Sequence, residues 1–259
     1  MIHRISNYIS YWLNALGKHS LQAPFIYQLY TEVIDVKPSK DIFHSLRQLK
    51  NKLAVSNVVI EWTNFGATSK VQGGKSQKLS KVVGRGTSSD KKSQLLNRLA
   101  QFNRSKVVVE LGTSVGINTC YLATNSNIKV FTFEGSEQLA SIANGIFSSH
   151  NEAKNIELIS GNIDKTLPEF LASPRQVDFA FVDANHRYEA TIAYFEQLKA
   201  VASQDTILVF DDIYWSKEMT AAWKYIIAQP EVTLSIDLFE VGLIFFREDI
   251  SKQHYQLNF

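Results

Sequence analysis

Residues 107–118 read Val-Val-Val-Glu-Leu-Gly-Thr-Ser-Val-Gly-Ile-Asn. The valines predict a short buried strand, and Gly112 and Gly116 predict a tight turn from that strand into a helix. The backbone of such a turn can approach a ligand closely, and a helix start offers N–H groups to a carboxylate or a phosphate. Because the pattern is not Gly-x-Gly-x-x-Gly, a dinucleotide pyrophosphate is the poorer candidate. A purely structural turn is the alternative.

From about residue 94 onward, strand-like and helix-like patterns alternate. Strands joined by helices predict an α/β fold with a parallel sheet and helices on both faces. Two apolar runs on either side of Glu240 predict a terminal antiparallel hairpin. The expected strands lie at 107–109, 129–133, 156–159, 177–182, 206–210, 232–239 and 241–246.

Two further zones precede this α/β domain, which we place at residues 94–259. Residues 1–56 show helical spacing of apolar residues and predict a helical extension. Residues 57–93 are rich in Gly, Ser and Lys and predict a basic, flexible segment or lid, with a solvated linker as the alternative. The chain has a formal net charge of +2, but residues 66–92 hold seven basic residues and one acidic residue. This segment therefore carries a net charge of +6, and the rest of the chain carries −4. This asymmetry favours a mobile lid or an anionic substrate near that segment.

The composition excludes several classes of protein. With 259 residues and 45% hydrophobic residues, the chain can bury a core, which excludes wholesale disorder. A single cysteine excludes an internal disulfide framework and favours a reducing compartment. No apolar run of about 18 residues exists, so we expect no membrane span and, by default, a cytoplasmic protein. A net charge of +2 gives no argument for a nucleic-acid partner.

The first residues predict an amphipathic helix rather than a signal peptide, because polar residues interrupt the apolar run. This helix packs on its own domain in the simplest interpretation, and a membrane-surface helix or a homodimer helix is the alternative. Its apolar residues, at helical spacing, are Ile2, Ile5, Ile9, Trp12, Leu13 and Leu16.

Polar residues follow the second and third strands, and ligands of open α/β sheets bind at the carboxyl ends of strands. Glu134 lies 22 residues after Gly112, where an acidic residue commonly accepts hydrogen bonds from ribose hydroxyls. A surface glutamate at a strand end is the alternative. Asn162 follows the third strand and could bond an adenine edge, although a turn asparagine fits as well.

Carboxylates follow the fourth and fifth strands, which we expect to be neighbours. Asp183, Asp211 and Asp212 would repel one another unless a positive group lay between them. A hard divalent cation with oxygen ligands, Mg²⁺ first, would satisfy that need. Capping of the following helices is the alternative for one or two of them. His186 lies three residues after Asp183 and is a candidate general base, with a structural role as the alternative.

Over about residues 94–247 these features resemble a class I S-adenosylmethionine-dependent methyltransferase. The resemblance implies a Rossmann-like seven-stranded sheet of order 3-2-1-4-5-7-6 with strand 7 antiparallel. It places the methionine end of the cofactor at Gly112, Thr113, Ser114 and Asn118, the ribose at Glu134, and the adenine near Asn162 and Ile163. The whole set of implied cofactor-binding residues is Glu110, Gly112, Thr113, Ser114, Gly116, Asn118, Glu134, Asn162, Ile163 and Asp183.

Within that family, Asp183 with Asp211 and Asp212 resembles the metal-dependent O-methyltransferases of the catechol and macrolide-sugar types. This resemblance implies Mg²⁺ on these carboxylates, Asp183 and His186 as catalytic residues, and methyl transfer to a hydroxyl of a small molecule. His186 replaces the lysine and Asp212 the asparagine of the catechol type, which favours the sugar type. A non-catalytic cofactor-binding or partner-binding module, a nucleotide-dependent oxidoreductase and an RNA methyltransferase are the alternatives.

Overall fold

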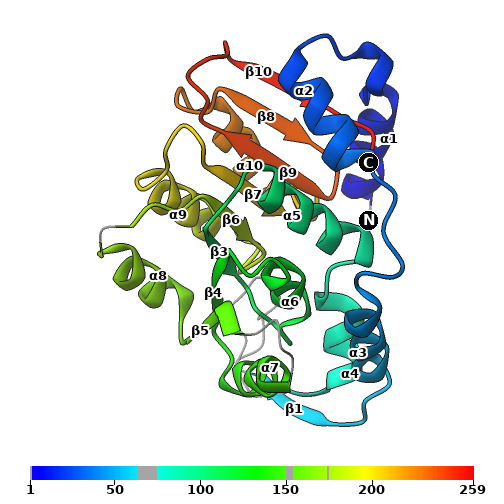
Figure 1. Cartoon of the computed structure of the whole chain (residues 1–259), viewed down its shortest axis with the longest axis vertical. Helices are drawn as coiled ribbons and strands as arrows, with labels where there is room; N and C mark the ends of the chain where they lie inside the picture. The colour runs from blue at the N-terminus through cyan, green and yellow to red at the C-terminus, as the bar shows by residue number, and fades with distance from the viewer. Residues whose placement is uncertain (1, 63–74, 150–153, 174) are drawn as a thin grey trace. The chain divides into compact units, whose positions relative to one another are not determined.

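The computed structural model describes residues 2–62, 75–149, 154–173 and 175–259, and the chain forms two compact units (Figure 1). The first unit combines Met1–Val36 with Pro174–Phe259, and the second is Lys37–Ser173. These units do not coincide with the three zones expected at 1–56, 57–93 and 94–259, so those zones remain a prediction about domain organisation.

The second unit holds three parallel strands in the order β3-β4-β5. Strand β4 (Lys129–Glu134) pairs with β3 (Val107–Leu111) on one side and with β5 (Ile156–Ser160) on the other. The strand at residues 107–111 is almost wholly buried, as its continuous apolar run predicts. This arrangement confirms the 3-2-1 part of the expected sheet order.

The first unit holds five strands among the residues that the structure describes. Strand β7 (Ile207–Asp211) pairs in parallel with β6 (Phe179–Val182) and antiparallel with β9 (Val241–Phe245). Strand β8 (Leu234–Asp237) forms the expected hairpin with β9. This arrangement confirms the 4-5-7-6 part of the order.

One strand of the first unit was not expected. Strand β10 (Gln253–Gln256) adds to β8 in parallel, so the expectation of seven strands is wrong by one. Its sequence, Gln-His-Tyr-Gln, has no apolar run or alternation, and pairing with β8 is therefore a tertiary effect that the sequence pattern does not carry.

Helices pack along the strands of each unit (Figure 1), as expected for an α/β fold with crossover connections. The α-helices of the second unit are α3 (His44–Ala54), α4 (Leu79–Gly86), α5 (Asp90–Phe102), α6 (Ile117–Ala123), α7 (Glu137–Ser149) and α8 (Ile163–Leu171). Those of the first unit are α1 (Ile2–Asn14), α2 (Pro24–Leu29), α9 (Tyr188–Lys199) and α10 (Lys217–Ala228). Short turns of other helix types lie at Lys18–Ser20 and Tyr30–Ile34.

Part of the predicted lid is ordered in the second unit. Residues 63–74 of that segment lie outside the described residues. Strand β1 (Val59–Trp62) pairs antiparallel with β2 (Lys75–Lys78), and helix α4 follows directly. Three apolar residues of α4 at helical spacing are buried in the core of the unit: Leu79, Val82 and Val83. These side chains hold the later part of the basic segment to the core, because apolar burial of this kind stabilises by about 1.5–3 kcal/mol per side chain.

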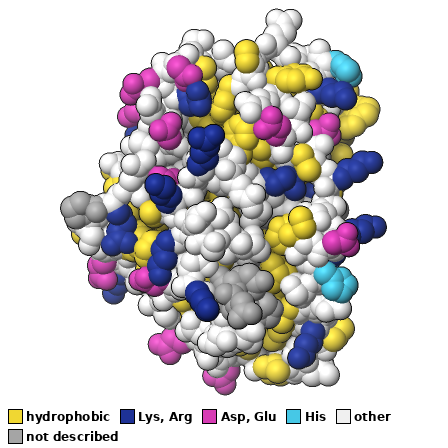
Figure 2. Space-filling view, viewed as in Figure 1, with side chains coloured by type: hydrophobic (Ala, Val, Ile, Leu, Met, Phe, Trp, Pro, Cys, Tyr) yellow, Lys and Arg dark blue, Asp and Glu magenta, His cyan; other side chains and the backbone are white. Residues whose placement is uncertain are grey.

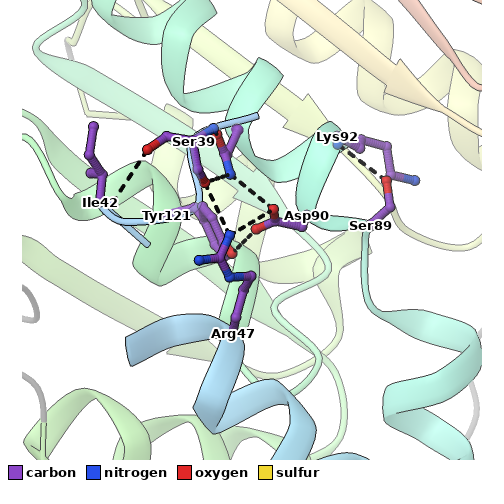
Figure 3. Close-up of polar contacts among 8 residues, drawn as sticks. Ser39, Ile42, Arg47, Ser89, Asp90, Lys92 and Tyr121 are labelled. Carbon is purple, nitrogen blue, oxygen red and sulfur yellow. Dashed lines mark hydrogen bonds and ion pairs between the residues drawn. The ribbon is translucent and has the colours of Figure 1, made fainter. Parts of the chain in front are cut away.

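A polar cluster joins the segment after Val36 to helices α3, α5 and α6 (Figure 3). The carboxylate of Asp90 accepts hydrogen bonds from the hydroxyl of Tyr121 and from Gln94 Nε2, the latter at 3.0 Å, and it lies 3.7 Å from Arg47 Nη1. Gln94 also exchanges hydrogen bonds with the backbone of Ser39, 2.7 Å to its N–H and 2.9 Å to its carbonyl oxygen. The cluster thereby fixes the entry into α3 against the first turn of α5.

The face of the described surface in Figure 2 shows no broad basic area. Lys and Arg side chains on that face are interspersed with Asp and Glu, and hydrophobic side chains lie between them. None of the described helices combines the length and apolar character that crossing a bilayer requires. The mixed charge agrees with the small net charge of the chain.

Candidate active site

The turn after β3 has the left-handed backbone that its glycines predict. Gly112, Ser114 and Gly116 have φ angles of 101°, 52° and 80°. At Gly116 a Cβ atom would lie 2.6 Å from the ring of Phe147 in α7, so the glycine permits close packing between the turn and α7. Ser114 adopts its angle without being a glycine, which is uncommon and is found disproportionately at functional sites.

Glu110 is fully buried beneath this turn and is fully engaged with the protein. Its carboxylate accepts hydrogen bonds from Asn118 Nδ2 at 2.7 Å, Thr119 Oγ1 at 2.5 Å and Thr132 Oγ1 at 2.7 Å. Burial raises the pKa of Glu110, and the three hydrogen bonds oppose that rise. Glu110 therefore holds β3, β4 and α6 together.

Two further polar residues, one in the turn and one in α6, are also buried. The hydroxyl of Thr113 lies 2.6 Å from that of Thr132, inside the protein. Asn118 is 8% exposed, and its Oδ1 atom is buried without a hydrogen-bond partner in the described part of the chain. An unsatisfied buried carbonyl of this kind is unfavourable by about 1–3 kcal/mol, so a donor from a bound molecule would stabilise the site.

Glu134 ends β4 and lies against the turn. One carboxylate oxygen accepts from the N–H of Ser114 at 2.7 Å, and the other accepts from the N–H of Ser136 at 2.8 Å. Burial and, to a smaller extent, the charge of Glu110 raise the pKa of Glu134, and hydrogen bonds from the backbone of Ser136, Ser114 and Gly135 oppose the rise. The carboxylate is thereby fixed at the carboxyl end of a central parallel strand, as the sequence predicts.

Asn162 follows β5 and caps helix α8. Its side chain accepts a hydrogen bond from the N–H of Asp164 at 3.1 Å, which is the turn-asparagine role left open by the sequence. Gly161, with φ 136°, donates its N–H to the carbonyl oxygen of Glu134 at 2.9 Å. Ile163 begins α8 and is buried.

Buried hydroxyls before and within α5 form a feature that the sequence analysis missed. Thr87 Oγ1, Ser88 Oγ and Ser93 Oγ are buried with no hydrogen-bond partner among the described residues. Lys50 Nζ donates to the carbonyl oxygen of Ser88 at 2.7 Å, and burial lowers the pKa of this lysine. No motif marks these hydroxyls, since serine and threonine are common in turns and at helix starts.

In the first unit, a charged cluster follows β6 and β7. His186 Nε2 lies 3.3 Å from Asp183 Oδ1 and 3.4 Å from Asp212 Oδ2. Burial alone would lower the pKa of His186, but the carboxylates of Asp183, Asp212 and Asp211 raise it to about 9. The imidazole is therefore charged at pH 7 and is the positive group between the carboxylates.

The backbone around this cluster is strained. Asn185, His186 and Asp212 have φ angles of 65°, 45° and 53°, and the N–H of His186 donates to the carbonyl oxygen of Ala184 at 2.8 Å. Such residues typically cost 1–3 kcal/mol each, and they cluster where function requires them. Asn185, whose Oδ1 is buried without a partner in the described part of the chain, was also missed by the sequence analysis.

The capping alternative for these aspartates is excluded. Ser216 caps α10 by accepting from the N–H of Met219 at 3.1 Å, so Asp212 does not perform that role. The N-cap of α9 is Arg187, with no side-chain cap. Asp183 and Asp212 instead lie at the two strand ends where they face one imidazole.

The residues as placed do not fit the expected Mg²⁺ site. No group of three His, Cys, Asp or Glu residues in the described ranges could hold a metal ion. The point on which Asp183 and Asp212 converge is taken by the imidazole of His186, and Asp211 is buried at the end of β7. The positive group that the sequence analysis assigned to a cation is a side chain in this structure.

Residues 109–213, which contain Glu110, Glu134, Asn162 and the cluster around His186, match the family model of a methyltransferase domain. The matched segment is therefore similar to methyltransferase domains. A search of curated protein sequences found no significant match.

Solved structures share the fold. An O-methyltransferase from Bacillus cereus in complex with S-adenosylhomocysteine is 19% identical, with a TM-score of 0.57, covering 85% of this chain and 97% of its own. The O-methyltransferase TomG from Streptomyces achromogenes, in complex with S-adenosylmethionine, is 18% identical, with a TM-score of 0.55, covering 62% and 82%. The methyltransferase PaMTH1 from Podospora anserina, bound to S-adenosylhomocysteine, is 14% identical, with a TM-score of 0.54, covering 83% and 99%.

Proposed function

We propose that this methyltransferase domain binds S-adenosylmethionine and transfers its methyl group to a hydroxyl oxygen of a small molecule. The observation that carries the proposal is the fixed carboxylate of Glu134, held by the N–H groups of Ser114 and Ser136 at the end of β4. Neighbours of the same fold are described as O-methyltransferases bound to S-adenosylmethionine or S-adenosylhomocysteine.

We place the cofactor on the second unit. Each carboxylate oxygen of Glu134 accepts one N–H and retains capacity for a ribose hydroxyl. Oδ1 of Asn118 supplies an acceptor for the ammonium group of the methionine end. Thr113 would support the turn from within, because its hydroxyl faces Thr132, its N–H donates to Phe133 and its carbonyl oxygen accepts from Gly116. Gly112 and Ser114 give the turn its shape, and Glu110 supports it from beneath.

The reaction requires the acceptor oxygen to attack the methyl carbon in line while the carbon–sulfur bond breaks. The electron pair of that bond stays on sulfur, and the acceptor loses a proton. His186, with Asp183 and Asp212, is the group that would accept this proton. Because the pKa of His186 is raised to about 9, the neutral, proton-accepting form is a minority at pH 7 and grows as the pH rises.

A variant of this proposal is that Mg²⁺ binds to Asp183, Asp211 and Asp212 and assists the methyl transfer. It would require the imidazole of His186 to leave its position between two of the carboxylates. We assign no step to the metal.

Calorimetric titration with S-adenosylmethionine tests the cofactor. We expect binding to the wild type, at least tenfold weaker binding to Glu134→Gln, and no change for Glu137→Gln, an exposed carboxylate three residues away. Thermal unfolding of each variant checks that the fold is kept. No heat with the wild type would remove the proposal, and an NADH fluorescence titration would then test the oxidoreductase alternative.

A second measurement separates an enzyme from a binding module. Formation of S-adenosylhomocysteine is followed with a panel of small hydroxyl acceptors, including catechols, sugars and anionic phenols, at about pH 8.5. Turnover that His186→Asn reduces at least tenfold supports catalysis. Binding of the cofactor without turnover on any acceptor favours the non-catalytic module.

A further inference from the structure

Helix α1 packs on the first unit through one face only. Tyr11, the buried residue of the helix, donates its hydroxyl to the carbonyl oxygen of Leu257 at 2.5 Å. The ring of Tyr8 lies edge-on to Phe239 with 4.9 Å between centroids. His3 Nε2 lies 2.9 Å from Thr220 Oγ1 on the same side. The docked face is therefore made of aromatic and polar residues.

The opposite face is apolar and exposed. The exposed fraction of its side chains lies between 52% and 86%. Single exposed apolar residues are common on monomeric proteins, but a contiguous row of them is unusual. These residues are Ile2, Ile5, Ile9, Trp12 and Leu13. The helix packs on its own domain, as expected in the simplest interpretation of the sequence, but its apolar row faces solvent.

The spacing of this row identifies its kind of partner. Ile2, Ile5, Ile9 and Trp12 are separated by three, four and three residues, which is the narrow seam of a helix that pairs with another helix. An exposed small side chain, Ser6, lies beside the seam and allows a facing helix to approach closely. A seam of this kind is self-complementary, as a twofold interface requires.

The charges of α1 argue against a membrane surface as the partner. Helices that lie on membranes carry Lys and Arg on their polar face. The only Lys or Arg of α1 is Arg4, which lies 3.8 Å from Glu240 Oε1 and stacks over Trp215 and Phe239 at 5.9 and 5.8 Å. The polar face is thus packed against the protein and offers no basic surface to anionic lipids.

We propose that the exposed row of α1 is the interface for a second copy of this chain, in a twofold dimer through paired α1 helices. The 13 residues of α1 span about 20 Å, so this contact alone is smaller than the ~800 Å² per partner of a standard interface. The dimer is accordingly weak and depends on concentration, with a Kd on the order of micromolar.

Sedimentation velocity on the full chain, from about 1 to about 100 μM, tests the proposal. We expect a monomer–dimer equilibrium in the wild type, at least tenfold weaker association in Ile9→Glu, and unchanged association in Ser10→Glu, which adds the same charge to α1 outside the seam. Equal thermal stability of both variants and the wild type checks that the helix remains docked.

Three outcomes would overturn the proposal. The wild type remains monomeric at the highest concentration, Ile9→Glu dimerises as well as the wild type, or Ser10→Glu loses dimerisation as Ile9→Glu does. Co-sedimentation with phosphatidylcholine–phosphatidylserine vesicles covers the membrane alternative, and vesicle binding by a monomer that Ile9→Glu abolishes would assign the row to lipid instead. Cofactor titration of the same variants keeps this test separate from the proposed function.

Discussion

His186 Nε2 lies 3.3 Å from Asp183 Oδ1, which makes the imidazole the counter-ion of an aspartate at the end of a buried strand. Asp212 approaches the same nitrogen from the end of the neighbouring strand β7 at 3.4 Å. The relationship explains how carboxylates that would repel one another coexist here, and it ties the stability of the first unit to the charge of one side chain.

The first prediction concerns stability and pH. The pKa of His186 is raised from 6.5 to about 9, so its charged form stabilises the fold fully below about pH 6.5, and this contribution is lost as the pH rises through 9. We expect His186→Asn to be less stable than the wild type by at most about 3 kcal/mol near pH 6, and the difference to shrink toward pH 10. Urea unfolding across this range measures it.

His254 serves as a control, because its pKa is shifted in the opposite direction from that of His186. Burial lowers the pKa of His254, whose Nδ1 lies 2.8 Å from Ser235 Oγ. The contribution of His254 to stability is therefore present at high pH and is lost as the pH falls. The loss of stability caused by His254→Asn should accordingly become smaller at acidic pH. A stability difference for His186→Asn that stays constant with pH would contradict the ion pair.

The second prediction concerns metal binding. If the imidazolium and Mg²⁺ compete for Asp183 and Asp212, the affinity for Mg²⁺ should rise as the pH increases from about 7 to about 9.5, because His186 loses its charge. His186→Ala should bind Mg²⁺ more tightly than the wild type at pH 7, and Asp211→Ala should bind it more weakly if this residue is a ligand. Isothermal titration calorimetry with MgCl₂ measures all three. Affinity that does not change with pH or with His186→Ala would exclude competition.

The strands and their carboxyl ends could be predicted from the sequence because burial in a parallel sheet imposes continuous apolar runs. Val107–Leu111 and Ile207–Asp211 show this, and the candidate residues Gly112 and Asp212 follow directly after them. Strand β10 could not be predicted, since its Gln-His-Tyr-Gln sequence becomes a strand only through β8.

The partners of polar side chains could not be predicted in the same way. Glu110 fits a ligand site by motif, but Thr119 and Thr132, which complete its hydrogen bonds, come from another helix and strand. Likewise, helical spacing identified the apolar row of α1 without showing which face docks. That choice depends on Phe239 and Leu257, which are more than 200 residues away in the sequence.

The third prediction tests Glu110, the buried carboxylate that holds β3, β4 and α6 together. Glu110→Ala leaves Asn118, Thr119 and Thr132 without their shared acceptor, so we expect a loss of about 3–5 kcal/mol in the free energy of unfolding. The matched control is Glu157→Ala on β5, an exposed carboxylate 3.3 Å from Lys129 Nζ, whose loss should change stability by less than about 1 kcal/mol. Chemical denaturation measures both. Equal losses of stability in the two variants would show that Glu110 does not hold these elements together.

The fourth prediction compares two glycines around the same helix. Gly116→Ala places a methyl group 2.6 Å from Phe147 of α7 at a φ of 80°, so we expect a loss of about 2–4 kcal/mol from strain and overpacking. Gly145→Ala, within α7, meets no atom within 4 Å and should stabilise by about 0.5–1 kcal/mol through helix propensity. Thermal and urea unfolding distinguish the two signs. Because Gly116 precedes α6 in the turn that Glu134 holds, Gly116→Ala should also weaken S-adenosylmethionine binding, whereas Gly145→Ala should not. A Gly116→Ala variant as stable as the wild type would show that the turn does not need its left-handed, closely packed conformation.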